Sequence, residues 1–214
     1  LGGRQPGAHY SGVSEKEINL AVALKLENLL TARGYQVVMT RSDDTGIGLY
    51  ERAELANASG ADLFVSLHSN AMANAPNFQG ILTYHYHSNS SGAELAQSIQ
   101  TAVCQVTGGT DRGVRSADFV VLRETDMSAA LVEMGYMSSP GELARLLDAS
   151  YQDKLAQGIA EGIAQYLGAT CQCGYSTIAA PRPCPSAFPP LRQAQVYRIC
   201  SWRYNEGVFQ GGAL

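Results

Sequence analysis

The stretch ADLFVSLH, residues 61–68, is an almost unbroken apolar run that ends in a histidine. A short apolar run of this kind is typical of a strand covered on both faces, as in a parallel sheet. AALVEM, residues 129–134, has the same character and carries Glu133 close to its end. The two runs indicate a sheet buried between layers of helices.

Helical patterns alternate with the apolar runs along the chain. Ser14 and Glu17 have the spacing of a capping box, which predicts a helix start. An apolar helical face follows, and Gly34 is predicted to end this helix. We predict further helices at residues 49–59, 91–106, 138–147 and 151–167, and further strands at 35–40, 80–87 and 119–122. This alternation predicts an α/β domain with a mostly parallel sheet flanked by helices on both faces.

Composition narrows the class of partner. The chain has 214 residues, a formal net charge of -4 and no run of Lys or Arg, which argues against nucleic acid as a partner. No apolar stretch approaches the roughly 20 residues that a membrane span needs. We therefore expect a monomer that binds neither nucleic acid nor a membrane.

The amino-acid composition of the chain changes after Gly168. Residues 169–214 contain most of the prolines and four of the five cysteines, and they show no sustained helical or strand period. The spacing of these cysteines does not match a zinc site. We predict a catalytic body at residues 1–168 and a poorly ordered tail at residues 169–214. A small attached module or an unselected extension remain alternatives for the tail.

Three residues stand where a ligand site is expected, because sites in such sheets lie beyond the carboxyl ends of the strands. They are Glu15 at the start of the first helix, His68 and Glu133. Glu15 also suits the positive end of a helix dipole, and His68 could be a hydrogen-bonded structural residue. A carboxylate at the end of an apolar strand, such as Glu133, is costly to bury without a partner. A histidine and carboxylates are the groups of a metal-assisted hydrolase.

The chain resembles the zinc-dependent N-acetylmuramoyl-L-alanine amidases over about residues 1–168. The stretches that carry the resemblance follow the order seen in that family: GG…PGA…G…EKEINL, VVMTR, LYERAELAN, ADLFVSLHSNA, GILTY, RGVR, FVVLR and ALVEMGYMSSPGEL. The resemblance implies a twisted sheet and a cell-wall hydrolase. Such an enzyme cleaves the amide between N-acetylmuramic acid and L-alanine in peptidoglycan with zinc-activated water.

The resemblance also implies roles for individual residues. Zinc is expected to bind Glu15, His68 and a histidine in the glycine-rich loop, and Glu133 matches the catalytic glutamate. The cofactor is then Zn²⁺, the partner is peptidoglycan, and the place of action is extracellular or the cell wall (the periplasm in a Gram-negative source). Arg52 could pair with a peptide carboxylate, although a packing role is the stronger interpretation.

Leu1 departs from the family pattern, since it stands where the first zinc-binding histidine is expected. The strand that precedes this position in the family is absent, so we expect the sheet to lack its first strand, an interior one. Leucine cannot bind a metal, so we expect weak zinc binding and impaired hydrolysis. N-terminal truncation is the favoured explanation, and natural loss of the site is the other. A non-catalytic relative that binds peptidoglycan is the alternative function. His9 is a weak candidate for a replacement ligand, and His85 and His87 have a spacing that can hold metal.

Overall fold

The computed structural model describes residues 1–173 and 195–198 of the chain. Its helices are α1 (Glu15–Ala32), α2 (Leu49–Ser59), α3 (Ser90–Thr107), α4 (Val120–Arg123), α5 (Pro140–Leu147) and α6 (Ala149–Cys173). Its strands are β1 (His9–Tyr10), β2 (Val13–Ser14), β3 (Gln36–Met39), β4 (Leu63–Asn70), β5 (Ile81–His85), β6 (Asp111–Ser116), β7 (Ser128–Tyr136) and β8 (Gln195–Arg198).

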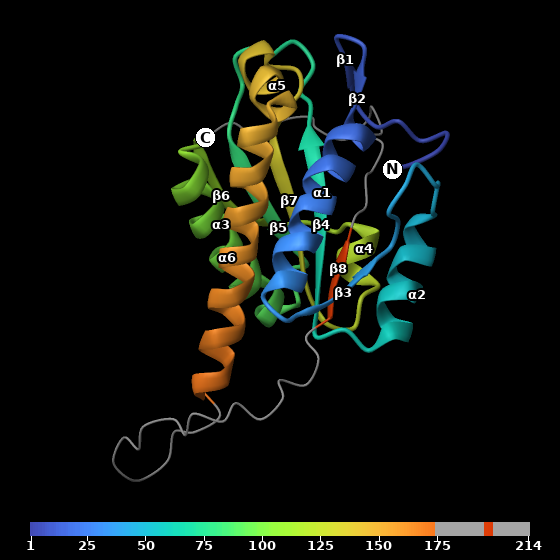
Figure 1. Ribbon diagram of the computed structural model, residues 1–214, viewed down its shortest axis with the longest axis vertical. Coiled ribbons are helices and arrows are strands. Elements are labelled where there is room, and N and C mark those ends of the chain that lie inside the picture. The colour runs from blue at the N-terminus through green and yellow to red at the C-terminus, as the bar shows by residue number, and fades with distance from the viewer. Residues whose placement is uncertain (174–194, 199–214) are drawn as a thin grey trace.

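Six of these strands form one sheet, in the order β3-β8-β4-β7-β5-β6 (Figure 1). Neighbouring strands are parallel except β5 and β7, which are antiparallel. The carboxyl ends of β4 and β7 therefore lie at the same edge as the amino ends of β5 and β6. We call this edge the site edge. The predicted α/β fold with a mostly parallel sheet is confirmed.

Strand β8 lies inside the sheet, between β3 and β4. Gln195–Arg198 pairs with four residues of β3, and Val196 and Tyr197 pair with Leu63 and Phe64 of β4. We predicted that this sheet would lack its first strand, an interior one. Instead, β8 covers the edge of β4 at its amino end. The rest of the predicted tail, residues 174–194 and 199–214, lies outside the described residues, so its order stays a prediction.

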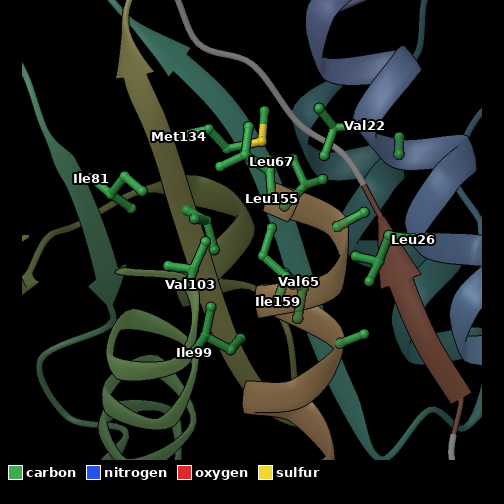
Figure 2. Packing of buried hydrophobic residues seen from close by; sticks show 14 of the residues in the cluster. Val22, Leu26, Val65, Leu67, Ile81, Ile99, Val103, Met134, Leu155 and Ile159 are labelled. Atoms are coloured by element: carbon green, nitrogen blue, oxygen red, sulfur yellow. The ribbon is translucent and has the colours of Figure 1, made fainter. Parts of the chain in front are cut away.

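The larger hydrophobic core fills one face of the sheet, between the strands and helices α1, α3 and α6. Figure 2 shows Val22 and Leu26 of α1 and Leu155 and Ile159 of α6 facing Val65 and Leu67 of β4. A smaller core on the other face joins Phe64 and Leu131 to residues of α2 and α4. Both faces are thus covered, which explains why β4 is apolar on both sides.

Two sequence predictions of secondary structure are wrong. FVVL was expected to be a strand, but Val120–Arg123 forms the single-turn helix α4, with Val121 and Leu122 buried in the smaller core. A four-residue apolar run cannot be assigned by periodicity alone. Gly168 was expected to end the last helix, but it does not adopt the positive φ of a helix-ending glycine, and α6 continues to Cys173.

The starts of helices α1 and α5 differ in how they are capped. Ser14 and Glu17 do form a capping box at α1. Ser139 precedes α5 with the same Ser-x-x-Glu spacing, but here Glu142 does not complete a box. Glu142 instead accepts hydrogen bonds from the backbone N–H groups of Gly80 and Tyr136, at 2.9 and 2.7 Å. This carboxylate therefore ties α5 to the site edge.

The contact between α3 and α6 depends on small residues. A Cβ added at Gly162 would lie 2.4 Å from Ile99 Cα and 2.7 Å from the Ser98 carbonyl oxygen. Gly162→Ala should therefore force the helices apart and destabilise the protein by about 1–3 kcal/mol, which exceeds the gain in helix propensity of at most about 1 kcal/mol.

Thermal melting of Gly162→Ala checks this prediction. Gly168→Ala is the matched control in the same helix, because an added Cβ there meets no atom within 4 Å. The control should be neutral or stabilising. Equal melting temperatures for the two variants would contradict the tight α3–α6 contact.

Candidate active site

Glu15 is the centre of a buried hydrogen-bond network at the site edge. Its Oε1 lies 3.0 Å from His68 Nδ1 and accepts hydrogen bonds from Asn19 Nδ2 at 3.0 Å and from the Ser69 N–H at 3.2 Å. Its Oε2 accepts from the Ala8 N–H at 3.1 Å. The start of α1 thus brings Glu15 to the end of β4, although 53 residues separate it from His68 in the sequence.

His68 and Glu133 lie side by side on neighbouring strands, because they are paired Cα partners in the parallel register of β4 and β7. Each has a buried side-chain atom without a hydrogen-bond partner, His68 Nε2 and Glu133 Oε2. Such atoms are rare in folded proteins and commonly mark a place where a ligand or ion binds. All three predicted site residues therefore meet at one place on the site edge.

The protonation states of these groups follow from burial and from their neighbours. Burial alone would raise the pKa of Glu15, but the hydrogen bonds from His68, Asn19 and the Ala8 N–H, together with the charge that His68 carries when protonated, outweigh it and lower the pKa. Burial lowers the pKa of His68 despite the opposing effect of Glu15. The result is an ionised carboxylate beside a neutral imidazole, which are the forms that bind metals.

Glu133 behaves in the opposite way. Burial, and secondarily the negative charge of Glu15, raise the pKa of Glu133 well above its ordinary value. A carboxylate with a raised pKa holds protons more readily than an exposed one, which is the property of a general base or acid. The structure thus places two carboxylates of opposite character at one site.

The side chain of Leu1 lies next to the Glu15 carboxylate. It is buried, and the Leu1 Cδ1 and Glu15 Oε2 atoms crowd the same point beside Gly7, 2.0 and 2.4 Å from where a Cβ on Gly7 would lie. The side chain next to Glu15 at this point is therefore a hydrocarbon that offers no electron pair.

The donor set fits zinc only in part. Glu15 and His68 offer an oxygen and a nitrogen of the right chemistry, whereas catalytic zinc sites have three protein ligands. Within residues 1–173 and 195–198, no group of three or more His, Cys, Asp or Glu side chains could hold a metal ion. Glu15 Oε1 and His68 Nδ1 lie 3.0 Å apart, a separation that two ligands of one zinc ion can have, but the third donor is missing at Leu1.

The other histidines lie apart from this network. His9 is exposed, and its Nδ1 lies 3.1 Å from Ser14 Oγ. His85 ends β5 with its Nδ1 2.9 Å from the Tyr86 carbonyl oxygen, while the His87 ring packs on Tyr86 beyond the strand. Strand β5 ends at His85, so the alternation that would put His85 and His87 on one face of a strand does not reach His87.

Arg52 has the packing role that we favoured from the sequence. It is fully buried, and it donates hydrogen bonds to Thr40 Oγ1, the Ile47 carbonyl and the Leu1 carbonyl. These contacts fix the amino-terminal segment against α2. Arg52 is therefore not available to bind a substrate carboxylate.

Two residues that support Glu15, Asn19 and Ser69, were not predicted from the sequence. Asn19 lies one helical turn after Glu15 and donates to it, and Ser69 Oγ donates to Asn19 Oδ1 at 3.0 Å. The i, i+4 spacing of Glu15 and Asn19 was a signal for this pair. The role of Ser69 depends on a contact between distant elements, which no local pattern reveals.

Comparison with known proteins decides the family. The family model described as N-acetylmuramoyl-L-alanine amidase matches residues 1–165. The chain belongs to this amidase family. It is 36% identical to N-acetylmuramoyl-L-alanine amidase LytC of Bacillus subtilis over 77% of this chain, and 38% identical to the endolysin of Bacillus phage SPP1 over 82%. The solved amidase of Clostridium difficile 630 shares 40% identity with a TM-score of 0.76, covering 78% of this chain and 92% of that one.

The chain spans only part of the length of these two curated relatives. The matched region covers 34% of LytC and 66% of the SPP1 endolysin. In the part of the chain that the structure describes, none of the helices has the length and apolar character to cross a membrane.

Proposed function

We propose that this chain is the catalytic domain of a cell-wall hydrolase that cleaves the amide between N-acetylmuramic acid and L-alanine in peptidoglycan. The observation that carries the proposal is the meeting of Glu15, His68 and Glu133, from three distant segments, at one edge of the sheet. Membership of the amidase family supports the same reaction. We infer that the protein acts outside the cytoplasm, at the cell wall, where its substrate lies.

In this proposal Glu15 and His68 hold a zinc ion, weakly, because Leu1 gives no third ligand. Zinc, when bound, supplies Lewis-acid polarisation of the amide carbonyl and activation of water. Asn19 and the N–H groups of Ala8 and Ser69 keep the Glu15 carboxylate ionised and oriented. These contacts preorganise the two donors before any metal arrives.

Glu133 is the proposed general base and acid. Its Oε2 is buried without a partner, so it is free to take a proton from the attacking water and to give one to the leaving amine. Its raised pKa suits both transfers, since a carboxyl with a pKa near the working pH can accept and return a proton.

A non-catalytic protein that binds peptidoglycan is the second candidate. The buried hydrocarbon of Leu1 beside Glu15 favours it, because this side chain replaces a metal donor. Such a protein would keep the site edge and the hydrogen-bond network while lacking turnover.

The test is release of free stem peptides from purified peptidoglycan, with zinc absent, stoichiometric and in large excess. The proposal predicts slow release that appears only with excess zinc and disappears on chelation. Binding of peptidoglycan with no release at any zinc concentration would favour the non-catalytic candidate.

A further inference from the structure

An arginine lies at the site edge two strands from Glu133, on β6. Arg112 Nε donates a hydrogen bond to the Gln79 carbonyl oxygen at 2.6 Å, and the guanidinium carbon lies 4.1 Å from the centre of the Phe78 ring. Phe78 in turn meets Tyr136 edge-on, with ring centres 4.8 Å apart. Tyr136 follows Glu133 by three residues on β7, so these contacts link Arg112 to the strand that carries the proposed base.

Gly80 makes room for this arrangement. A Cβ there would lie 2.8 Å from Arg112 Cγ and 3.1 Å from Arg112 Nε, and Gly80 has a φ of 125°, which L side chains rarely adopt. The stem of Arg112 therefore lies over bare backbone. Stacking on Phe78 and the bond from Nε fix the orientation of the guanidinium and reduce the entropy lost when it binds a ligand.

The two terminal nitrogens of Arg112 have no acceptor among the described residues. Among those residues, the Arg112 side chain makes one hydrogen bond, from Nε to the Gln79 carbonyl oxygen, and takes part in none of the ion pairs. A half-buried, oriented guanidinium with free terminal N–H groups is the usual partner for a carboxylate, which it binds through two parallel hydrogen bonds.

The distance to the proposed reaction centre suits a peptide. Glu133 pairs with Leu82 of β5, and Arg112 lies on β6 between the partners of Ile81 and Thr83. Two strand spacings make about 10 Å between the backbones of Glu133 and Arg112. One or two extended residues of about 3.3–3.6 Å each, together with the arginine side chain, cover that span. Burial, and then the charges of Glu133 and Tyr84, raise the pKa of Tyr136 to about 12, while Arg112 and Arg115 oppose this, so Glu133 and Arg112 both act on the same tyrosine.

We propose that Arg112 is a specificity residue that binds a carboxylate of the peptide stem, one or two residues beyond the amide at Glu133. The inference rests on the proposed function, since it assumes that the stem leaves the reaction centre toward β6. Phe78 and Gly80 act as positioning residues for Arg112. The chain should therefore prefer stems with free carboxylates to stems in which these are amidated.

The test is calorimetric binding of N-acetylmuramoyl-L-alanyl-D-glutamate and of its diamide to the full chain. The free acid should bind the unaltered chain about 10- to 100-fold more tightly than the diamide. Arg112→Gln should remove that preference, and Arg112→Lys should restore part of it. Arg145→Gln is the matched control, because Arg145 also stacks on an aromatic ring, that of Tyr151 at 4.2 Å. Circular dichroism verifies that each variant is folded.

Equal affinity of the unaltered chain for acid and diamide would overturn the inference, as would equal effects of Arg112→Gln and Arg145→Gln. The binding readout separates this inference from the proposed function. Preference for the acid without hydrolysis would remove the hydrolase and keep the carboxylate subsite. Hydrolysis without any preference would do the reverse.

Discussion

Replacing Leu1 with histidine should raise the zinc affinity of the chain by at least about 10- to 100-fold. That range is the measured cost of losing a residue that merely supports a metal ligand, and a direct ligand contributes at least as much. The physical reason is that Leu1 lies against the Glu15 carboxylate, so an imidazole at this position would complete a set of three protein donors with Glu15 and His68. Competition with a chromophoric chelator measures the affinity, and stem-peptide release should rise in parallel.

Two controls make the Leu1→His result specific. Leu1→Phe adds a ring of similar size without a nitrogen donor and should leave zinc affinity unchanged. His9→Ala in the Leu1→His background should have no effect, since His9 is exposed and hydrogen-bonded to Ser14. A Leu1→His protein that binds zinc no better than the unaltered chain would refute the idea that Leu1 occupies the place of a ligand.

Glu133→Gln should lower kcat for stem-peptide release by about 10²–10⁴-fold with little change in KM. Glutamine keeps the shape of the side chain but cannot exchange a proton at its oxygen. The rate is best measured with zinc in excess, and again in the Leu1→His background. Glu94→Gln, at an exposed glutamate on α3, is the control and should retain full activity. Retention of activity in Glu133→Gln would assign proton transfer to another group.

The same Glu133→Gln substitution should stabilise the metal-free protein above the ordinary glutamate pKa. Because the pKa of Glu133 is raised on folding, the folded state holds its proton longer than the unfolded state does. The unaltered protein therefore loses stability as pH rises through the raised pKa, and the glutamine variant does not. The lowered pKa of Glu15 acts in the opposite direction, but Glu15 is present in both proteins, so the comparison isolates the Glu133 charge together with its repulsion of Glu15.

Thermal melts from about pH 4 to about pH 8 test this pH dependence. The melting temperatures should coincide at the acid end and diverge by a few degrees as pH rises, with the variant more stable. A constant difference across the range would show that Glu133 does not carry an unpaired buried charge.

Much of the fold was predictable because local signals and tertiary packing agree. The apolar run at 61–68 became β4, which both cores cover, and LYERAELANAS became α2, with Gly60 in the left-handed conformation at its end. The prediction failed at FVVL, where four apolar residues could satisfy either a strand or a helical turn, and burial under α2 decided for the turn. Strand β6 was also missed, since DRGVRS is polar and exposed and carries no alternating pattern.

The candidate site was predictable in its members but not in its details. The three acidic and histidine side chains stood at element ends, where a parallel sheet places ligands. Their protonation states could not be foreseen, because these depend on contacts across 53 residues of sequence and on the burial of Glu133. Neither the apolar contact of Leu1 with the network nor the stacking of Arg112 on Phe78 leaves a local trace in the sequence.

We propose that Glu15 and His68 are two ligands of one zinc ion at the site edge. X-ray diffraction at the zinc absorption edge, on crystals soaked in excess zinc, locates such an ion. We predict one anomalous peak within about 2.0–2.2 Å of a Glu15 oxygen and a His68 nitrogen. Peaks confined to other groups, such as His85 and His87, with none between Glu15 and His68, would contradict the claim.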